Sequence, residues 1–284
     1  MATLRLVTRG SRLALYQSVL VKDTILSKDP ETVVELLEVA TTGDRQIGWS
    51  LEKQGGVGLF TKELEQRLLD READIAVHSS KDLPAKIVDG LEVAGYLPRE
   101  EAHDVLILRE DVEDPATIAT GSPRRREQLS PLYPKVEWKE IRGNVETRLN
   151  KIRDGFADGT LLAAAGLNRL GIHAWENIKF VPLPITEMVP SPGQGAIAVQ
   201  CRQGESGIFP EGMFCEDTRR AVEAEKSLMA HLGGGCHSCI GAHVTGNRML
   251  VFHEDTRQYE FPVSKADDEE VGGIAKELLN KLPH

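Results

Sequence analysis

Short apolar runs and longer segments of helical periodicity alternate along the first part of the chain, and this alternation constrains the fold more than any other feature. Strand-like runs at 4–8, 33–41 and 74–78 are separated by helical patterns at 11–27 and 60–72. Parallel strands need long crossover connections, which are usually helices. The order strand, helix, strand therefore predicts an α/β domain.

The same pattern starts again near Ala102, and we interpret it as a second α/β domain. Its expected elements are strands at 105–108, 118–119, 136–141, 160–165 and 178–183, with helices after Ser122 and at 144–154. The stretch at 190–195 is too rich in Pro and Gly to be helical. A buried strand expected at 196–201 could return the chain to the first domain.

The C-terminal part has a different order of elements. It reads as a helix at 218–232, a Gly-rich turn, three short strands between Cys239 and Val263, and a closing helix at 268–282. This order predicts a smaller α+β domain. A chain of 284 residues is long enough for three such units with cores of their own.

Composition narrows the function classes. The net charge of -10 argues against a general nucleic-acid surface, because binding a phosphate backbone needs an excess of basic groups over a broad face. Charged residues interrupt every apolar run before it reaches membrane-spanning length, so we expect a soluble cytoplasmic protein. In a reducing compartment Cys201, Cys215, Cys236 and Cys239 stay thiols, and each is a candidate nucleophile.

Two strand-to-helix junctions combine a capping serine with arginines. Ser11 follows Arg9 at the first junction, and Ser122 precedes three consecutive arginines at the second. Arginines at a helix N-terminus oppose the positive end of the helix dipole, and a bound anion would resolve that conflict. The alternative interpretation is an ordinary helix cap with solvated arginines.

Basic residues recur after further strands. Arg142, Gly143 and Arg148 follow the strand expected at 136–141, and Arg169 follows the strand expected at 160–165. Ligands of open α/β sheets bind at the carboxyl ends of the strands. A polycarboxylate held between the two domains would suit this set.

An acid accompanies these cations. Lys81 and Asp82 follow the strand at 74–78 directly, and a carboxylate beside a cation in a cleft can transfer a proton or stabilise a cation. A surface ion pair is the alternative.

The Gly-rich segment 54–60 lacks the Gly-Lys-Ser/Thr ending of a nucleotide-binding loop. We interpret it as a mobile loop.

Cys236 lies in a Gly-rich turn after the helix at 218–232, where its sulfur could reach a cleft. Three interpretations stay open: a reactive thiol, a buried structural cysteine, and a zinc site formed with His231, Cys239 and His243.

Together these segments resemble the porphobilinogen deaminase (hydroxymethylbilane synthase) family, in order from Thr8 to about Gly241. The matching motifs are Thr8-Arg9 with Ser11, Gly55-Gly56 with Gly58-Leu59-Phe60, Asp74-Ile75-Ala76-Val77-His78-Ser79 with Lys81-Asp82, Arg142-Gly143-Asn144-Val145, Ala165-Gly166-Leu167, Gly193-Gln194-Gly195-Ala196 and Gly234-Gly235-Cys236.

The resemblance implies two periplasmic-binding-protein-like α/β domains flanking a cleft, plus a small C-terminal α+β domain. The expected boundaries are 1–97 with 193–212, then 98–192, then 213–284. It also implies a transferase that condenses four porphobilinogen molecules and releases ammonia and the linear tetrapyrrole 1-hydroxymethylbilane, for tetrapyrrole biosynthesis. A monomer is expected, without nucleic-acid or membrane partners, that could hand its product to uroporphyrinogen-III synthase.

The family's site residues carry over to matching positions. Asp82 is implied as the catalytic carboxylate and Cys236 as the thioether anchor of one dipyrromethane cofactor, with no metal. The implied cofactor contacts are Lys81, Asp82, Thr120, Ser122, Arg124, Arg125, Arg142 and Gly143. The implied substrate contacts are Arg9, Ser11, Lys53, Arg148, Arg169 and Gln194.

Four positions depart from the family pattern. Val57 and Gly121 stand where a lysine and a serine are common, so no ligand role is assigned to either side chain. Gln200 replaces the usual glutamate. Cys239 replaces a proline and places a second thiol near Cys236, and we hypothesise that oxidation could link or block the two. A two-domain anion-binding protein without catalysis is the main rival function.

Overall fold

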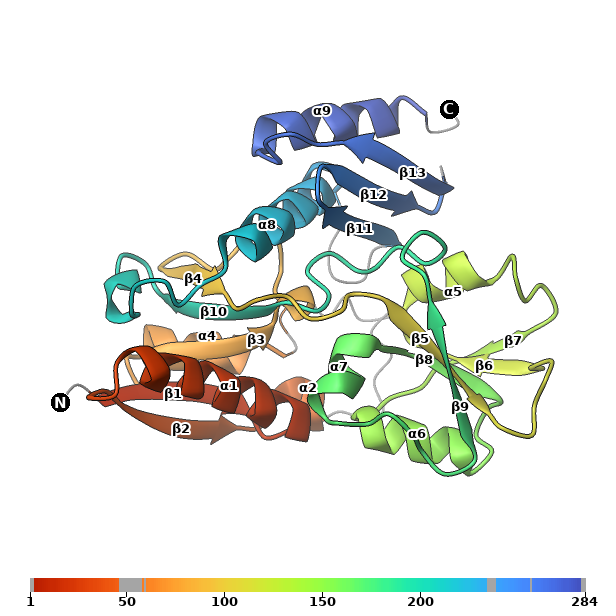
Figure 1. Cartoon of the computed structure of the whole chain (residues 1–284), viewed down its shortest axis with the longest axis horizontal. Coiled ribbons are helices and arrows are strands. Elements are labelled where there is room, and N and C mark those ends of the chain that lie inside the picture. Colours follow the sequence, from red (N-terminus) through yellow and green to blue (C-terminus); the bar gives the residue numbers. More distant parts are fainter. Residues whose placement is uncertain (1–2, 46–57, 59, 234–238, 256, 282–284) are drawn as a thin grey trace.

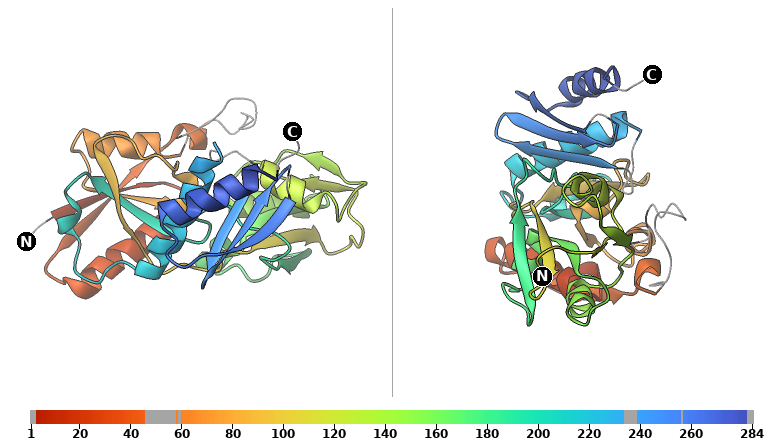
Figure 2. Two further views of the ribbon diagram at one scale, coloured as in Figure 1. Left: turned by 90° about the horizontal axis from the view of Figure 1, so that it is seen from above. Right: turned by 90° about the vertical axis from the view of Figure 1, so that its right-hand side faces the viewer.

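The computed structural model describes residues 3–45, 58, 60–233, 239–255 and 257–281 and contains three sheets (Figure 1). Two five-stranded mixed sheets lie side by side, and a three-stranded antiparallel sheet lies over their junction (Figure 2). The predicted fold class, two α/β units and a small C-terminal α+β unit, is confirmed. No helix in the described ranges is long and apolar enough to cross a membrane.

The first sheet has the order β2-β1-β3-β10-β4, in which β1, β2 and β3 are parallel and β10 is antiparallel to both of its neighbours. Its two faces are covered by different helices. Leu6 of β1 packs with Val21 and Ile25 of α1, whereas the next residue, Val7, packs with Leu64 of α4 on the other face. Burial on both faces explains why these strands read as continuous apolar runs. The elements of this unit are β1 (Thr3–Arg9), α1 (Arg12–Lys28), β2 (Val33–Val39), α2 (Thr42–Arg45), α4 (Lys62–Leu69), β3 (Ile75–Ser79), η1 (Ser80–Asp82), β4 (Leu91–Tyr96), β10 (Ile197–Arg202) and η2 (Ser206–Ile208).

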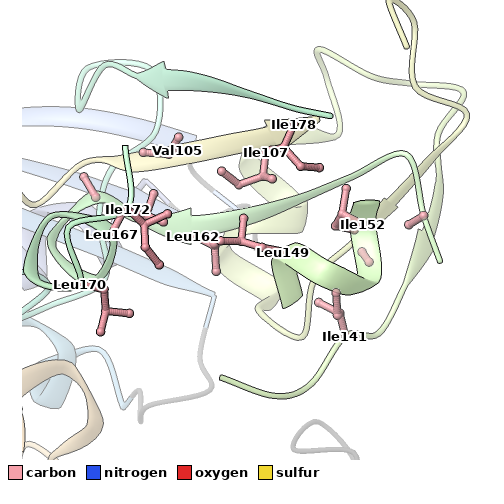
Figure 3. Packing of buried hydrophobic residues seen from close by; sticks show 13 residues of the cluster. Val105, Ile107, Ile141, Leu149, Ile152, Leu162, Leu167, Leu170, Ile172 and Ile178 are labelled. Carbon is pink, nitrogen blue, oxygen red and sulfur yellow. The ribbon is translucent and has the colours of Figure 1, made fainter. Parts of the chain in front are cut away.

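The second sheet has the order β7-β6-β8-β5-β9, with β5 antiparallel to both neighbours. Figure 3 shows Leu149 and Ile152 of α6 in one apolar cluster with Ile107 and Leu162 of the sheet. The elements are β5 (Asp104–Arg109), β6 (Thr117–Ala119), α5 (Pro123–Leu129), β7 (Glu137–Lys139), α6 (Val145–Arg153), β8 (Gly159–Ala163), α7 (Ala164–Arg169) and β9 (Ile178–Leu183).

The chain passes between the two α/β units twice. Each passage leads into a reversed strand, that is, a strand antiparallel to both of its neighbours. The segment after β4 leads into β5, and the segment after β9 leads into β10. Both reversed strands are internal to their sheets. The two passages therefore place residues 97–103 and 190–196 at the junction of the units.

The third unit is built on β11 (Ile240–Thr245), β12 (Arg248–His253) and β13 (Arg257–Pro262), with α8 (Glu216–His231) and α9 (Asp268–Leu279). Alternate residues of β12 point to opposite faces. Val251 joins the core shared with the two helices, whereas Leu250 and Phe252 pack against Val189 of the second passage. The small sheet is thus bound to the junction.

Two local expectations were wrong. The run at 160–165, expected as one strand, ends as β8 at Ala163 and continues directly into the buried helix α7. A short apolar run cannot distinguish a strand from a buried helix. Strand β4 was not predicted, although Leu91–Tyr96 forms an edge of the first sheet.

Candidate active site

A cavity of about 740 Å³ lies between the two α/β units. Its first wall comes from the segments that follow β1 and β3, including Ser11 and Lys81. Its second wall comes from the segments that follow β7 and β8, including Gly143 and Gly166. The cavity therefore lies at the carboxyl ends of parallel strands in both sheets, where α/β proteins bind ligands.

Cationic side chains outnumber acidic ones along the cavity, although the whole chain carries a charge of -10. The described lining contains six cations, which are Arg9, Lys81, Arg125, Arg142, Arg148 and Arg169. The acidic lining residues are Glu38, Asp82 and Glu146. This local excess of positive charge suits a ligand with several carboxylates.

The two serines predicted as helix caps act as caps. Ser11 Oγ accepts a hydrogen bond from the backbone N–H of Ala14 at 3.3 Å, and Ser122 Oγ accepts one from Arg125 at 3.4 Å. Ser11 also lines the cavity. Ser122 and Thr120 do not line it, and Thr120 Oγ1 accepts from the N–H of Ser122 at 3.2 Å.

Asp104 balances the positive charge of two of the arginines at the start of α5. Its carboxylate is fully buried and accepts from Arg124 and Arg125, each at 2.7 Å. Burial alone would raise the pKa of Asp104, but the charges of these two arginines hold it well below its ordinary value. We expected an external anion to balance the arginines, and sequence reasoning missed this internal one. Its signal was an acidic residue at the start of an apolar strand.

The two arginines face different surroundings. Arg124 donates its second bond to the carbonyl of Val189 at 2.7 Å and does not line the cavity. Arg125 lines the cavity while it also donates to the carbonyl of Leu161 at 2.9 Å. Arg124 is therefore a buried link between α5, β5 and the second passage, and only Arg125 presents itself to a ligand.

Gln194 also acts from behind the cavity wall. Its Nε2 donates to the carbonyl of Ala102 at 2.6 Å and to Asp104 at 3.0 Å, while its Oε1 accepts from Lys81 Nζ at 3.4 Å. The neighbours Gly193 and Gly195 line the cavity, whereas Gln194 itself does not. Gln194 thus connects Lys81 to the buried Asp104.

Several lining cations are desolvated. Burial lowers the pKa of Lys81 to about 8 and that of Arg148 to about 10, and the charge of Arg125 adds to both effects. Nε and Nη2 of Arg142 are buried and have no hydrogen-bond partner within the described part of the chain. Donors left in this state are costly unless a ligand satisfies them. Carboxylates of a bound ligand would satisfy them.

Asp82 and Lys81 lie in the one-turn helix η1 and line the cavity together, so they are not a solvated surface pair. Arg148 Nε donates to the carbonyl of Gly143 at 2.8 Å, and Arg169 donates to that of Gly195 at 2.7 Å. The structure thus brings the predicted acid into one cavity with arginines from the opposite unit.

The surroundings of His78 explain why a glutamine fits at position 200. Nε2 of His78 lies 3.0 Å from Gln200 Oε1, and Gln200 Nε2 donates to Glu65 at 3.1 Å. Burial lowers the pKa of His78 to about 4, so the imidazole is neutral at physiological pH. An amide at position 200 can accept from a neutral imidazole and donate to Glu65 at once.

Cys236, Lys53 and Val57 lie outside the described residues. Within the described ranges no group of three His, Cys, Asp or Glu side chains could hold a metal ion. His231 instead lies 3.1 Å from Asp268. Cys239 is buried beside Val189, and burial raises the pKa of its thiol to about 12. Its thiolate is therefore scarce near neutral pH, and the hypothesis of an oxidation with Cys236 stays a prediction.

Residues 4–209 match the family model described as "Porphobilinogen deaminase, dipyromethane cofactor binding domain". The chain belongs to the porphobilinogen deaminase family. Curated porphobilinogen deaminases include that of Syntrophobacter fumaroxidans, 43% identical with coverage of 84% of this chain and 79% of the relative. That of Lachnospira eligens is 39% identical and covers 97% of this chain and 98% of the relative.

Family membership confirms the predicted activity and cofactor class: porphobilinogen deaminase activity with a dipyrromethane cofactor, in tetrapyrrole biosynthesis. Among solved structures, the effector-binding domain of BenM with benzoate has a TM-score of 0.45 and 15% identity, with coverage of 82% of this chain and 94% of that chain.

Proposed function

We propose that the cavity between the two α/β units is the site where porphobilinogen is condensed, with Asp82 as the catalytic carboxylate and Cys236 as the anchor of the dipyrromethane. One observation carries this proposal: Asp82 lies in the same cavity as arginines of both units. A protein that only bound anions would not need an acid among its arginines.

The lining residues fall into two groups, one that would hold the dipyrromethane and one that would hold the incoming porphobilinogen. We assign Lys81, Arg125, Arg142 and Gly143 to the dipyrromethane, because Arg142 offers two unsatisfied buried donors and Arg125 is already fixed by Asp104. We assign Ser11 and three arginines to incoming porphobilinogen. These arginines are Arg9, Arg148 and Arg169. Guanidinium groups suit this role because each can bind a carboxylate through two parallel hydrogen bonds.

The remaining predicted ligands support the site from behind. Thr120, Ser122, Arg124 and Gln194 do not line the cavity, and their hydrogen bonds go to other protein groups. We propose that they hold Arg125 and Lys81 in place. Lys53 keeps its predicted role as a substrate contact.

The chemistry follows from the placement of Asp82. When bound, the dipyrromethane supplies the nucleophilic carbon on which the oligopyrrole grows. Asp82 would stabilise the cation that porphobilinogen forms on losing ammonia, by accepting a hydrogen bond from the pyrrole N–H, and would take up a ring proton after the new bond has formed. The arginines would hold the substrate carboxylates. The reacting carbons would then keep a fixed orientation relative to Asp82.

The proposal is tested by replacing Asp82 with Asn, which keeps the shape of the side chain and removes the carboxylate charge. We expect kcat to fall by about 10²-fold or more, while intact mass still shows one dipyrromethane. Asp111→Asn is the control, because Asp111 is exposed, does not line the cavity and pairs with Arg109 on the surface. Turnover of the Asp82 variant within about three-fold of the parent would overturn the proposal.

We also propose the domain boundaries 1–97 with 193–212, 98–192, and 213–284. The three sheets support them, since their strands come from 3–96 with 197–202, from 104–183, and from 240–262.

Cysteine usage supports a cytoplasmic location. The enzyme is proposed to be a monomer that could pass its product to uroporphyrinogen-III synthase. Light scattering of the purified protein tests the monomer.

A further inference from the structure

Helix α8 of the third unit reaches the turn that carries Asp82. Lys226, on this helix, is buried and donates from Nζ to the carbonyl oxygen of Leu83 at 2.7 Å. Leu83 follows Asp82 directly. Lys226 does not line the cavity, so any effect on a ligand there passes through its neighbours.

The same helix also holds the side chain of Leu83. Leu83 is fully buried in a cluster that includes Val222 of α8 and Ala196 of the second passage. Val222 and Lys226 are four residues apart and therefore share one helix face. One face of α8 thus contacts Leu83 through an apolar side chain and through a charged hydrogen bond.

The other end of the turn is fixed by the second passage. The N–H of Ser80 donates to the carbonyl of Ala196 at 2.9 Å, and the N–H of Leu83 donates to Ser80 at 3.1 Å. Gly193, with φ of +74°, packs so closely on Ser80 that a Cβ there would lie 2.6 Å from Ser80 Oγ. Its N–H in turn donates to Glu225, the neighbour of Lys226, at 2.7 Å.

We propose that Lys226 is a positioning residue for Asp82: from α8 it fixes the end of the turn that carries Asp82. This inference rests on the role of Asp82 proposed above. A lysine serves because its charged hydrogen bond is stronger than a neutral one.

The test compares the full-length loaded enzyme with Lys226→Met and Lys226→Arg. Loading is measured by intact mass and folding by Tm. Per loaded molecule, we expect Lys226→Met to lower kcat by about 10-fold to 100-fold, since a small misplacement of a catalytic group has effects of this size. KM should change by less than about three-fold, and Lys226→Arg should recover most of kcat.

Arg220→Met is the matched control. Arg220 lies on the same helix and also donates to backbone carbonyls, those of Ser264 and Lys265, but these belong to the third unit. Its loss should leave kcat within about three-fold of the parent. If Lys226→Met does not fold, Lys226→Gln takes its place under the same criterion.

A double variant with Asp82→Asn separates the two proposals. If Lys226 acts through Asp82, adding Lys226→Met to Asp82→Asn lowers kcat no further. Normal kcat in loaded Lys226→Met, together with a large loss in Asp82→Asn, would overturn the positioning role and leave the proposed function intact. Normal turnover in Asp82→Asn would overturn both.

Discussion

Lys81 is a residue whose charge changes close to physiological pH. Its pKa of about 8 in the folded protein lies below its ordinary value of 10.5, so the ammonium charge is present below pH 8 and is lost above it. We expect kcat/KM for porphobilinogen to fall as pH rises through about 8, because the carboxylates of the dipyrromethane that receives the substrate then lose the cationic partner proposed above. In Lys81→Arg the fall should move to higher pH. An unchanged profile would assign the fall to another group, such as the substrate amine.

His78 is the second residue whose charge the fold determines. Gln200→Glu would place a carboxylate against the imidazole, and we expect the pKa of His78 to rise from about 4 to above about 6, because an opposite charge favours the protonated ring. Titration of the histidine Cε1 proton by NMR measures this. His173, which lies between α7 and β9 in the second α/β unit, serves as the internal reference. A pKa that stays near 4 would show that burial dominates.

At the scale of one element, α5 depends on its cap. Ser122→Ala removes the hydrogen bond to Arg125 N and should lower the free energy of unfolding by about 1 kcal/mol. Urea unfolding measures the loss. Ser130→Ala, at the residue that follows the last turn of this helix, is the control, because Ser130 Oγ donates to the carbonyl of Arg126 and does not cap the N-terminus. An equal loss in both variants would argue that the cap adds nothing specific.

The elements also show what a sequence can predict and why. Both serine caps and most strands follow from local rules, because capping and alternation depend on neighbours in the chain. The inward turn of Arg124 could not be predicted, since its partners Asp104 and Val189 are brought to it only by the pairing of distant strands. The start of α7 was missed because Ala164 and Ala165 are apolar and buried in either conformation.

For the whole molecule, Glu225 links the third unit to both passages. It is fully buried, pairs with Arg99 at 2.6 Å, and accepts from the N–H groups of Gly193 and Val244. Glu225→Gln leaves Arg99 without a charged partner, and we expect a loss of about 3–5 kcal/mol in the free energy of unfolding.

Glu223→Gln provides the comparison for that loss. Glu223 lies on the same helix, and its partner Arg219 is exposed. Its replacement should change the free energy of unfolding by no more than about 1 kcal/mol. Denaturant unfolding of both variants gives the difference, and similar losses would mean that burial of the Arg99 pair is not what stabilises the junction.

The reversed strand β10 has a consequence for the order of events on the ribosome. The second sheet draws all its strands from the uninterrupted stretch 104–183, so it can be completed as soon as that stretch has emerged. Strand β4 lies at the edge of the first sheet and pairs with β10, which is synthesised after the whole second unit. During translation β4 therefore lacks its partner in this sheet, and one edge of β3 stays open, until the second unit has been synthesised.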